Sequence, residues 1–191
     1  MKFPLVSLIT CLLIAVTSCL SSGAASCPQS RHLFYIANNS NPNVVYYDIC
    51  LDRNNNISAD DPVNIYWVTV SGKTRGLNII ENKFGYGLSS IEKNGGNSVG
   101  FTVAALKTTP ITVAMVNGQY RATINSEQGE IIIDKVYVNA ASRVIGLPKV
   151  NYVDIIGHTS KGNKAATERI TNDPKLKTSL DREVGVDGLP N

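Results

Sequence analysis

The hydrophobic residues of this chain fall into short runs separated by polar turns, which is the pattern of a β-rich domain. Residues 63–70 form the clearest run, because they combine β-branched and aromatic residues and include Trp67, the single tryptophan. Eight further runs are expected as strands, at residues 32–37, 43–51, 86–93, 99–106, 111–116, 119–124, 130–140 and 150–156. We therefore predict a mainly β fold, either an antiparallel β-sandwich or an open barrel of eight to nine strands, with one short helix.

The short helix is expected at residues 77–87, where the hydrophobic period changes. Leu77, Ile80 and Phe84 recur at helical spacing, so they share one face of a helix. An apolar stripe this short is stable only when it is packed against another element. We therefore predict that Trp67 points into the core and contacts this face of the helix.

The last 31 or so residues lose the strand pattern, because charges alternate there and apolar residues become sparse. We expect one helical turn at residues 165–170 and otherwise a charged, loosely ordered tail over residues 161–191. The predicted organisation is thus a signal peptide at residues 1–25, a single β domain at residues 26–160, and this tail.

The N-terminal segment has the features of an export signal. Lys2 precedes an apolar stretch at residues 5–16 that is too short to span a bilayer, and residues 23–25 (Gly-Ala-Ala) suit a signal peptidase. A second processing site competes, because residues 16–19 (Val-Thr-Ser-Cys) resemble a bacterial lipobox in which Cys19 would carry the lipid. We expect an exported protein that is periplasmic, secreted or lipid-anchored to the membrane, and both processing sites stay open.

Four cysteines occur in the chain, at positions 11, 19, 27 and 50. Cleavage after residue 25 leaves Cys27 and Cys50, an even pair that is a disulfide candidate in an oxidising compartment. The alternative is two free thiols, with Cys50 buried in its strand like any small apolar residue.

Composition narrows the class of protein further. A hydrophobic content of 43% excludes a disordered chain, and 191 residues are enough for one domain with a core. The formal net charge is only +3, and no basic run with interleaved aromatic residues occurs. Nucleic-acid binding therefore has no electrostatic support.

Two loops approach known ligand-binding motifs without matching them. Residues 52–61 place oxygen side chains at alternating positions, as calcium loops do, but Ile57 stands where such a loop needs Gly and Val63 where it needs Glu. Residues 157–164 resemble a phosphate-binding loop, but the required Lys is displaced by one residue and the hydroxyl is missing. Both segments are better explained as polar loops, and we expect no metal and no cofactor.

Catalytic signatures are similarly weak. His32 and His158 are the only histidines, and no third ligand accompanies them for zinc. An Asp154–His158 pair would suit acid–base chemistry, although strand-end polar groups explain it more simply. No Gly-x-Ser-x-Gly nucleophile elbow occurs in the sequence.

The eight tyrosines all lie in or beside expected strands. A row of exposed tyrosines on one sheet face would form a platform for a glycan or a peptide. Adjacent residues of a strand point to opposite faces, so Tyr46 and Tyr47 cannot both belong to such a row. The sequence therefore favours the simpler interpretation, with half of the tyrosines in the core and half in ordinary cross-strand pairs.

Several segments resemble a known family, the uncharacterised exported proteins catalogued as domain of unknown function 4833. The similarity covers roughly residues 32–170, and its segments are residues 32–39, 43–48, 62–67, 77–87 (ending Phe-Gly-Tyr-Gly) and 148–157. The resemblance implies a small exported bacterial β-protein, and it brings no catalytic residues.

From these observations we expect an exported cell-envelope β-domain that binds or scaffolds without catalysis. Its partner would be an envelope protein, a peptide or a glycan, with no nucleic acid and with membrane contact only through a lipid on Cys19. The alternative is a small secreted hydrolase whose site is assembled from scattered polar residues, because convergent active sites leave no local signature. A calcium-stabilised adhesion module is a third option.

Overall fold

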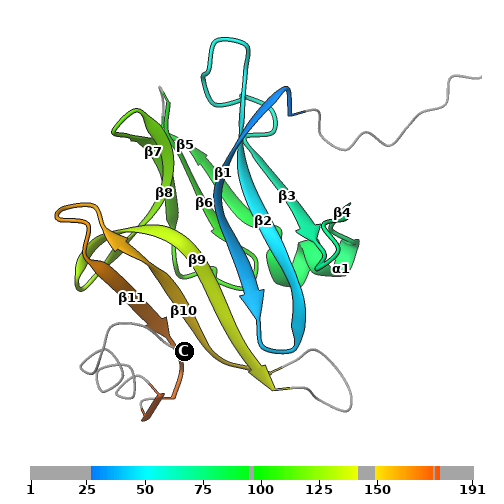
Figure 1. The fold of residues 1–191 in the computed structure, drawn as a ribbon, viewed down its shortest axis with the longest axis vertical. Coiled ribbons are helices and arrows are strands. Elements are labelled where there is room, and N and C mark those ends of the chain that lie inside the picture. Colours follow the sequence, from blue (N-terminus) through cyan, green and yellow to red (C-terminus); the bar gives the residue numbers. More distant parts are fainter. Residues whose placement is uncertain (1–26, 95–96, 142–148, 174, 177–191) are drawn as a thin grey trace, which may run out of the picture.

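The computed structural model describes residues 27–94, 97–141, 149–173 and 175–176, and within them the chain forms one mixed, curled β-sheet (Figure 1). Its elements are β1 (Gln29–Asn38), β2 (Asn41–Leu51), β3 (Val63–Val68), β4 (Thr74–Gly76), α1 (Ile79–Glu81), the π-helical turn η1 (Asn82–Tyr86), β5 (Leu88–Lys93), β6 (Val99–Val103), β7 (Ile111–Val116), β8 (Gln119–Ser126), β9 (Gly129–Ala141), β10 (Lys149–Thr159) and β11 (Ala165–Ile170). The predicted mainly β class is confirmed, with β4 and β11 added to the nine expected strands.

The long strand β9 organises the sheet, because three other strands pair with it. One edge of β9 pairs antiparallel with β10 along most of its length, and β11 extends the sheet beyond β10. The other edge pairs first with β8 and then, in parallel, with β1. Two arms of the sheet, β1-β2-β3-β4 and β8-β7-β6-β5, diverge from β9 where these two pairings meet (Figure 1).

The parallel pairing of β1 with β9 departs from the antiparallel sheet that we expected. It joins residues 35–38 to residues 135–138, about a hundred positions apart in the chain. Neighbouring strands in the sequence are joined by turns and pair antiparallel, whereas this contact closes the sheet between its first and last thirds. Local sequence patterns carry no information on such a pairing.

The core lies between the two arms, where alternate residues of each strand point inward. Phe34 and Tyr47 are fully buried, and their rings stack with centroids 4.7 Å apart. Phe101 and Val113 contribute the opposite wall of the same cluster. Burying an aliphatic or aromatic side chain of this kind contributes roughly 1.5–3 kcal/mol, so this cluster is the main source of stability.

Trp67 lies in this core with 4% of its surface exposed, which confirms its predicted burial. Its ring meets the edge of Tyr86 at a centroid distance of 5.2 Å, and the Arg75 guanidinium covers it at 5.2 Å. Among the described residues the buried indole N–H has no hydrogen-bond partner. Trp67 is therefore held by ring contacts rather than by a polar partner.

The predicted contact between Trp67 and the helical face is wrong. Ile80 and Phe84 are each 61% exposed, and only Leu77 of the predicted stripe packs against the core. The physical reason is the change from α1 to the π-helical turn η1, which alters the number of residues per turn. The turn therefore presents Tyr86, not Phe84, to the indole ring.

The predicted helical turn at residues 165–170 is also wrong, because these residues form strand β11. It pairs antiparallel with β10 from Val153 opposite Ile170 to His158 opposite Ala165. Arg169 in this segment is buried and its side chain binds the carboxylate of Asp154. A charged residue here was therefore no evidence for a solvent-exposed tail. The ordered sheet consequently continues beyond residue 160.

Candidate functional site

The face of β1, β2 and β3 that points away from the core carries a row of aromatic rings. Tyr46 is paired with Tyr35 on one side and with Tyr66 on the other, and both ring centroids lie 5.9 Å from that of Tyr46. The His32 ring extends the row, with its centroid 4.6 Å from Tyr46. The three tyrosines are half-buried and His32 is exposed. We call these four residues the aromatic row, and part of it faces solvent.

The row exists because β2 alternates strictly between its two faces. Val45 and Tyr47 point into the core, so Tyr46 between them points outward, as the sequence indicated. The sequence interpretation of ordinary cross-strand pairs was incomplete. The pairs are present, but the registers of three strands join them into one continuous surface.

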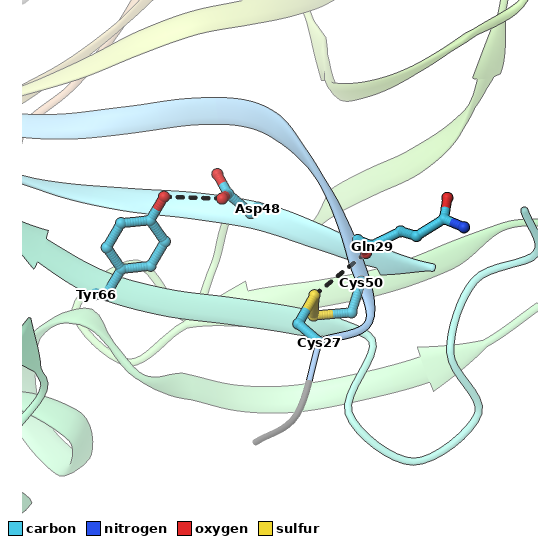
Figure 2. The surroundings of a disulfide bond; sticks show 5 residues. All are labelled: Cys27, Gln29, Asp48, Cys50 and Tyr66. Carbon is cyan, nitrogen blue, oxygen red and sulfur yellow. Dashed lines mark hydrogen bonds between the residues drawn. A yellow bond between two sulfur atoms is a disulfide. The ribbon is translucent and has the colours of Figure 1, made fainter. Parts of the chain in front are cut away.

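Asp48 lies beneath the aromatic row and hydrogen-bonds two of its members. It is 6% exposed, because the rings of its neighbours cover it. Its Oδ1 lies 3.0 Å from His32 Nδ1. Its Oδ2 accepts a hydrogen bond of 2.8 Å from the Tyr66 hydroxyl, which Figure 2 shows. Burial and the Asp48 carboxylate together raise the pKa of the Tyr66 phenol well above its usual range. Tyr66 therefore stays protonated at neutral pH and holds Asp48 in place.

A disulfide joins Cys27 to Cys50 beside this array, with 5.2 Å between the two Cα atoms (Figure 2). Cys50 follows Asp48 by two positions on β2, so the two residues share a face of the strand. The bond ties the start of β1 to the end of β2, close to where His32 meets Asp48. The lipidation candidate Cys19 and the predicted signal peptide lie outside the described residues.

Two hollows of ≈ 420 and ≈ 340 Å³ adjoin each other at Gln119 and Arg121 of β8, and we call them together the cleft. The larger hollow is lined by Arg31 and His32 on the β1 side and by Gln119 and Arg121 on the β8 side. The smaller hollow shares Gln119 and Arg121 and extends to His158 on β10. His32 therefore belongs to both the aromatic row and the cleft.

His158 is paired with Asp134 and not with Asp154. The His158 Nδ1 lies 3.2 Å from Asp134 Oδ2 on the neighbouring strand, whereas both oxygens of Asp154 bind Arg169. Four residues span about 13 Å in a strand, so Asp154 and His158 cannot touch as they would in a helix. The acid–base pair considered from the sequence is therefore not formed.

The loop at residues 52–61, considered for calcium, uses its first carboxylate internally. Asp52 Oδ1 accepts hydrogen bonds from the backbone N–H groups of Asn54 at 2.7 Å and Asn56 at 2.9 Å. In the part of the chain that the structure describes, no three His, Cys, Asp or Glu side chains gather into a group suited to a metal ion. No helix in the same part has the length and apolar character needed to cross a membrane.

Fold and site together define a mainly β domain that carries an aromatic row and a neighbouring cleft on one curled sheet. Residues 34–169 match the family described as Domain of unknown function (DUF4833), and the chain belongs to this family. The resemblance seen in the sequence is thereby confirmed. No curated protein and no solved structure matches the chain.

Proposed function

We propose that the chain is an exported domain of the cell envelope that binds a glycan through the aromatic row without catalysing a reaction. The row carries this proposal, because it sets four rings at centroid spacings of 4.6 to 5.9 Å on a rigid sheet. Aromatic faces accept the C–H-bearing face of a sugar ring, while their polar atoms bond its hydroxyls. An extended peptide would instead add to the edge of a sheet, and the row lies on a face.

Export rests on the sequence of residues 1–25, with its apolar segment and its two processing sites. Mass spectrometry of the native protein tests it. We expect a mature chain that begins at Ser26 or at an acylated Cys19. A chain that retains Met1 would contradict export, and the proposed location at the cell envelope would then be wrong.

A hydrolase is the second candidate, and the His32–Asp48 contact favours it, because a carboxylate behind a histidine is a common arrangement for a general base. Two observations weigh against it. The Tyr66 phenol, with its raised pKa, is a poor nucleophile, and it occupies the second Asp48 oxygen. Among the described residues no serine or cysteine is hydrogen-bonded to His32.

Binding is tested by calorimetric titration with pentamannose and with a tetramer of N-acetylglucosamine. We expect at least one of these probes to bind, and Tyr46→Ala to weaken that binding by about tenfold or more, as loss of a central aromatic contact does. Phe84→Ala is the matched control, because it removes an exposed aromatic ring outside the row. Equal losses in both variants would contradict the assignment of the row.

A further inference from the structure

We propose that the glycan bound by the aromatic row is anionic, and that its carboxylate or phosphate group binds in the cleft between Arg31 and Arg121. This inference rests on the proposed function and specifies its ligand. The row and the cleft meet at His32, which lines the larger hollow and stacks beside Tyr46. Arg31 and Arg121 line the same hollow as His32, so we expect a saccharide of a few units on the row to extend past His32 into that hollow.

The charge of the cleft decides the sign of the ligand. Its described lining contains two arginines and two histidines, and it contains no aspartate or glutamate. Within the described residues, no carboxylate forms a salt bridge with Arg31 or Arg121, and Arg121 hydrogen-bonds only the amide oxygen of Gln119. The carboxylates of Asp48 and Asp134 contact the two histidines instead. Two guanidinium groups that have no carboxylate partner of their own among the described residues favour an incoming anion.

Other arginines of the same sheet show that this arrangement is not general. Arg75 forms a two-pronged contact with Glu81, and Arg169 forms one with Asp154. In each of those guanidinium groups, two nitrogens donate hydrogen bonds to one carboxylate of the chain. In the part of the chain that the structure describes, Arg31 and Arg121 have no such carboxylate, so their donors are available to a carboxylate or a phosphate of a ligand.

The two histidines of the cleft add the chemistry that recognises hydroxyls. Each has a carboxylate near Nδ1, Asp48 for His32 and Asp134 for His158. When Nδ1 donates its proton to that carboxylate, Nε2 is left as an acceptor. A sugar hydroxyl is a suitable donor, and the hollows of ≈ 420 and ≈ 340 Å³ each have the volume of a small-ligand site.

The test uses two matched pairs of probes, which are pentamannose phosphate with pentamannose, and tetragalacturonate with its methyl ester. At about 50 mM salt, we expect at least one anionic probe to bind about tenfold more tightly than its neutral partner, and the ratio to fall at about 500 mM salt because screening weakens the contact. Arg31→Gln with Arg121→Gln should remove this ratio. Lys149→Gln, an exposed lysine at the far end of β10, should preserve it.

The outcomes separate this inference from the proposed function. Equal affinity for charged and neutral probes overturns the anion site and leaves the aromatic row intact. Binding that depends on the two arginines but not on Tyr46 contradicts the row and supports the cleft. Inorganic phosphate that binds as tightly as pentamannose phosphate assigns the cleft to a free anion and overturns the glycan. Failure of all four saccharides to bind contradicts both proposals.

Discussion

Two buried carboxylates of the same sheet, Asp154 on β10 and Asp48 on β2, have different partners. Asp154 binds the Arg169 guanidinium with both oxygens, at 2.7 and 2.8 Å, and the Tyr152 ring covers that guanidinium at 4.1 Å. Asp48 binds a phenol and an imidazole instead. One of those two partners, His32, lines the cleft.

The difference separates a structural ion pair from a surface suited to binding. A buried carboxylate opposite a fixed guanidinium has its charge matched inside the protein, and removing one partner leaves the other in a poorly solvated place. Asp48 has no arginine or lysine partner among the described residues, so it orients the His32 and Tyr66 rings through hydrogen bonds. We therefore expect changes at Asp154 to affect stability, and changes around Asp48 to affect binding.

The largest expected effect is that of Asp154→Ala. The substitution leaves Arg169, which is 9% exposed, without its carboxylate, and breaking a buried pair in this way costs about 3–5 kcal/mol. Urea unfolding measures the change. Asp134→Ala, which removes an exposed carboxylate from the same sheet, should cost far less, and equal losses would refute the distinction.

The disulfide should give the next largest effect. Replacing both Cys27 and Cys50 by Ser removes a link across 23 positions, and loss of a native disulfide costs typically about 2–4 kcal/mol. Because the bond fixes the start of β1, NMR should show altered His32 signals and unchanged Arg169 signals. Equal changes at both residues would mean that the two regions do not respond independently.

A smaller effect is expected from Tyr66→Phe, which removes one hydrogen bond to Asp48 and keeps the ring. The loss of stability should be about 1.5–3 kcal/mol, as for hydrogen bonds to charged groups. Glycan binding should weaken as well, because the Asp48 side chain is less firmly held under the row. Unchanged binding with reduced stability would place Tyr66 among structural residues only.

The smallest effect concerns the exposed pair Arg75–Glu81, which is present at one edge of the sheet. Hydrogen bonds from Arg75 lower the pKa of the Glu81 carboxyl from 4.5 to about 2. The pair therefore stabilises the fold fully above pH 4.5, and this contribution is lost as the pH falls through about 2. Glu81→Gln should lower the urea midpoint slightly at pH 6 and by a smaller amount at pH 2.

Much of the fold could be predicted from the two-residue period of apolar positions. The nine expected strands are all present, and most of them bury one face, which leaves a local signature in the sequence. Strand β5 is the exception, because its residues after Leu88 are exposed. Strand β4 was missed because its residues Thr74–Gly76 are exposed and polar, so no apolar alternation marks them. Strand β11 was missed because its buried Arg169 looks like a surface charge until Asp154 is placed opposite it.

The site was harder to predict, because its parts are distant in the chain. Arg31, Arg121 and His158 come from β1, β8 and β10, three strands that are brought together by their separate pairings with β9. One local signal was available, because Tyr46 and Asp48 are two positions apart in β2 and therefore lie on the same face of the strand. That signal placed them together but did not show that β1 and β3 add further rings.

The central claim is that the aromatic row and the cleft form one binding surface, and NMR titration tests it most directly. Pentamannose phosphate is added to the isotope-labelled mature protein, and shifts are followed for side chains and amides. The account predicts that the largest shifts fall on Tyr35, Tyr46, Tyr66, Arg31 and Arg121. Shifts confined to the exposed apolar residues of α1, or an absence of shifts, would contradict it.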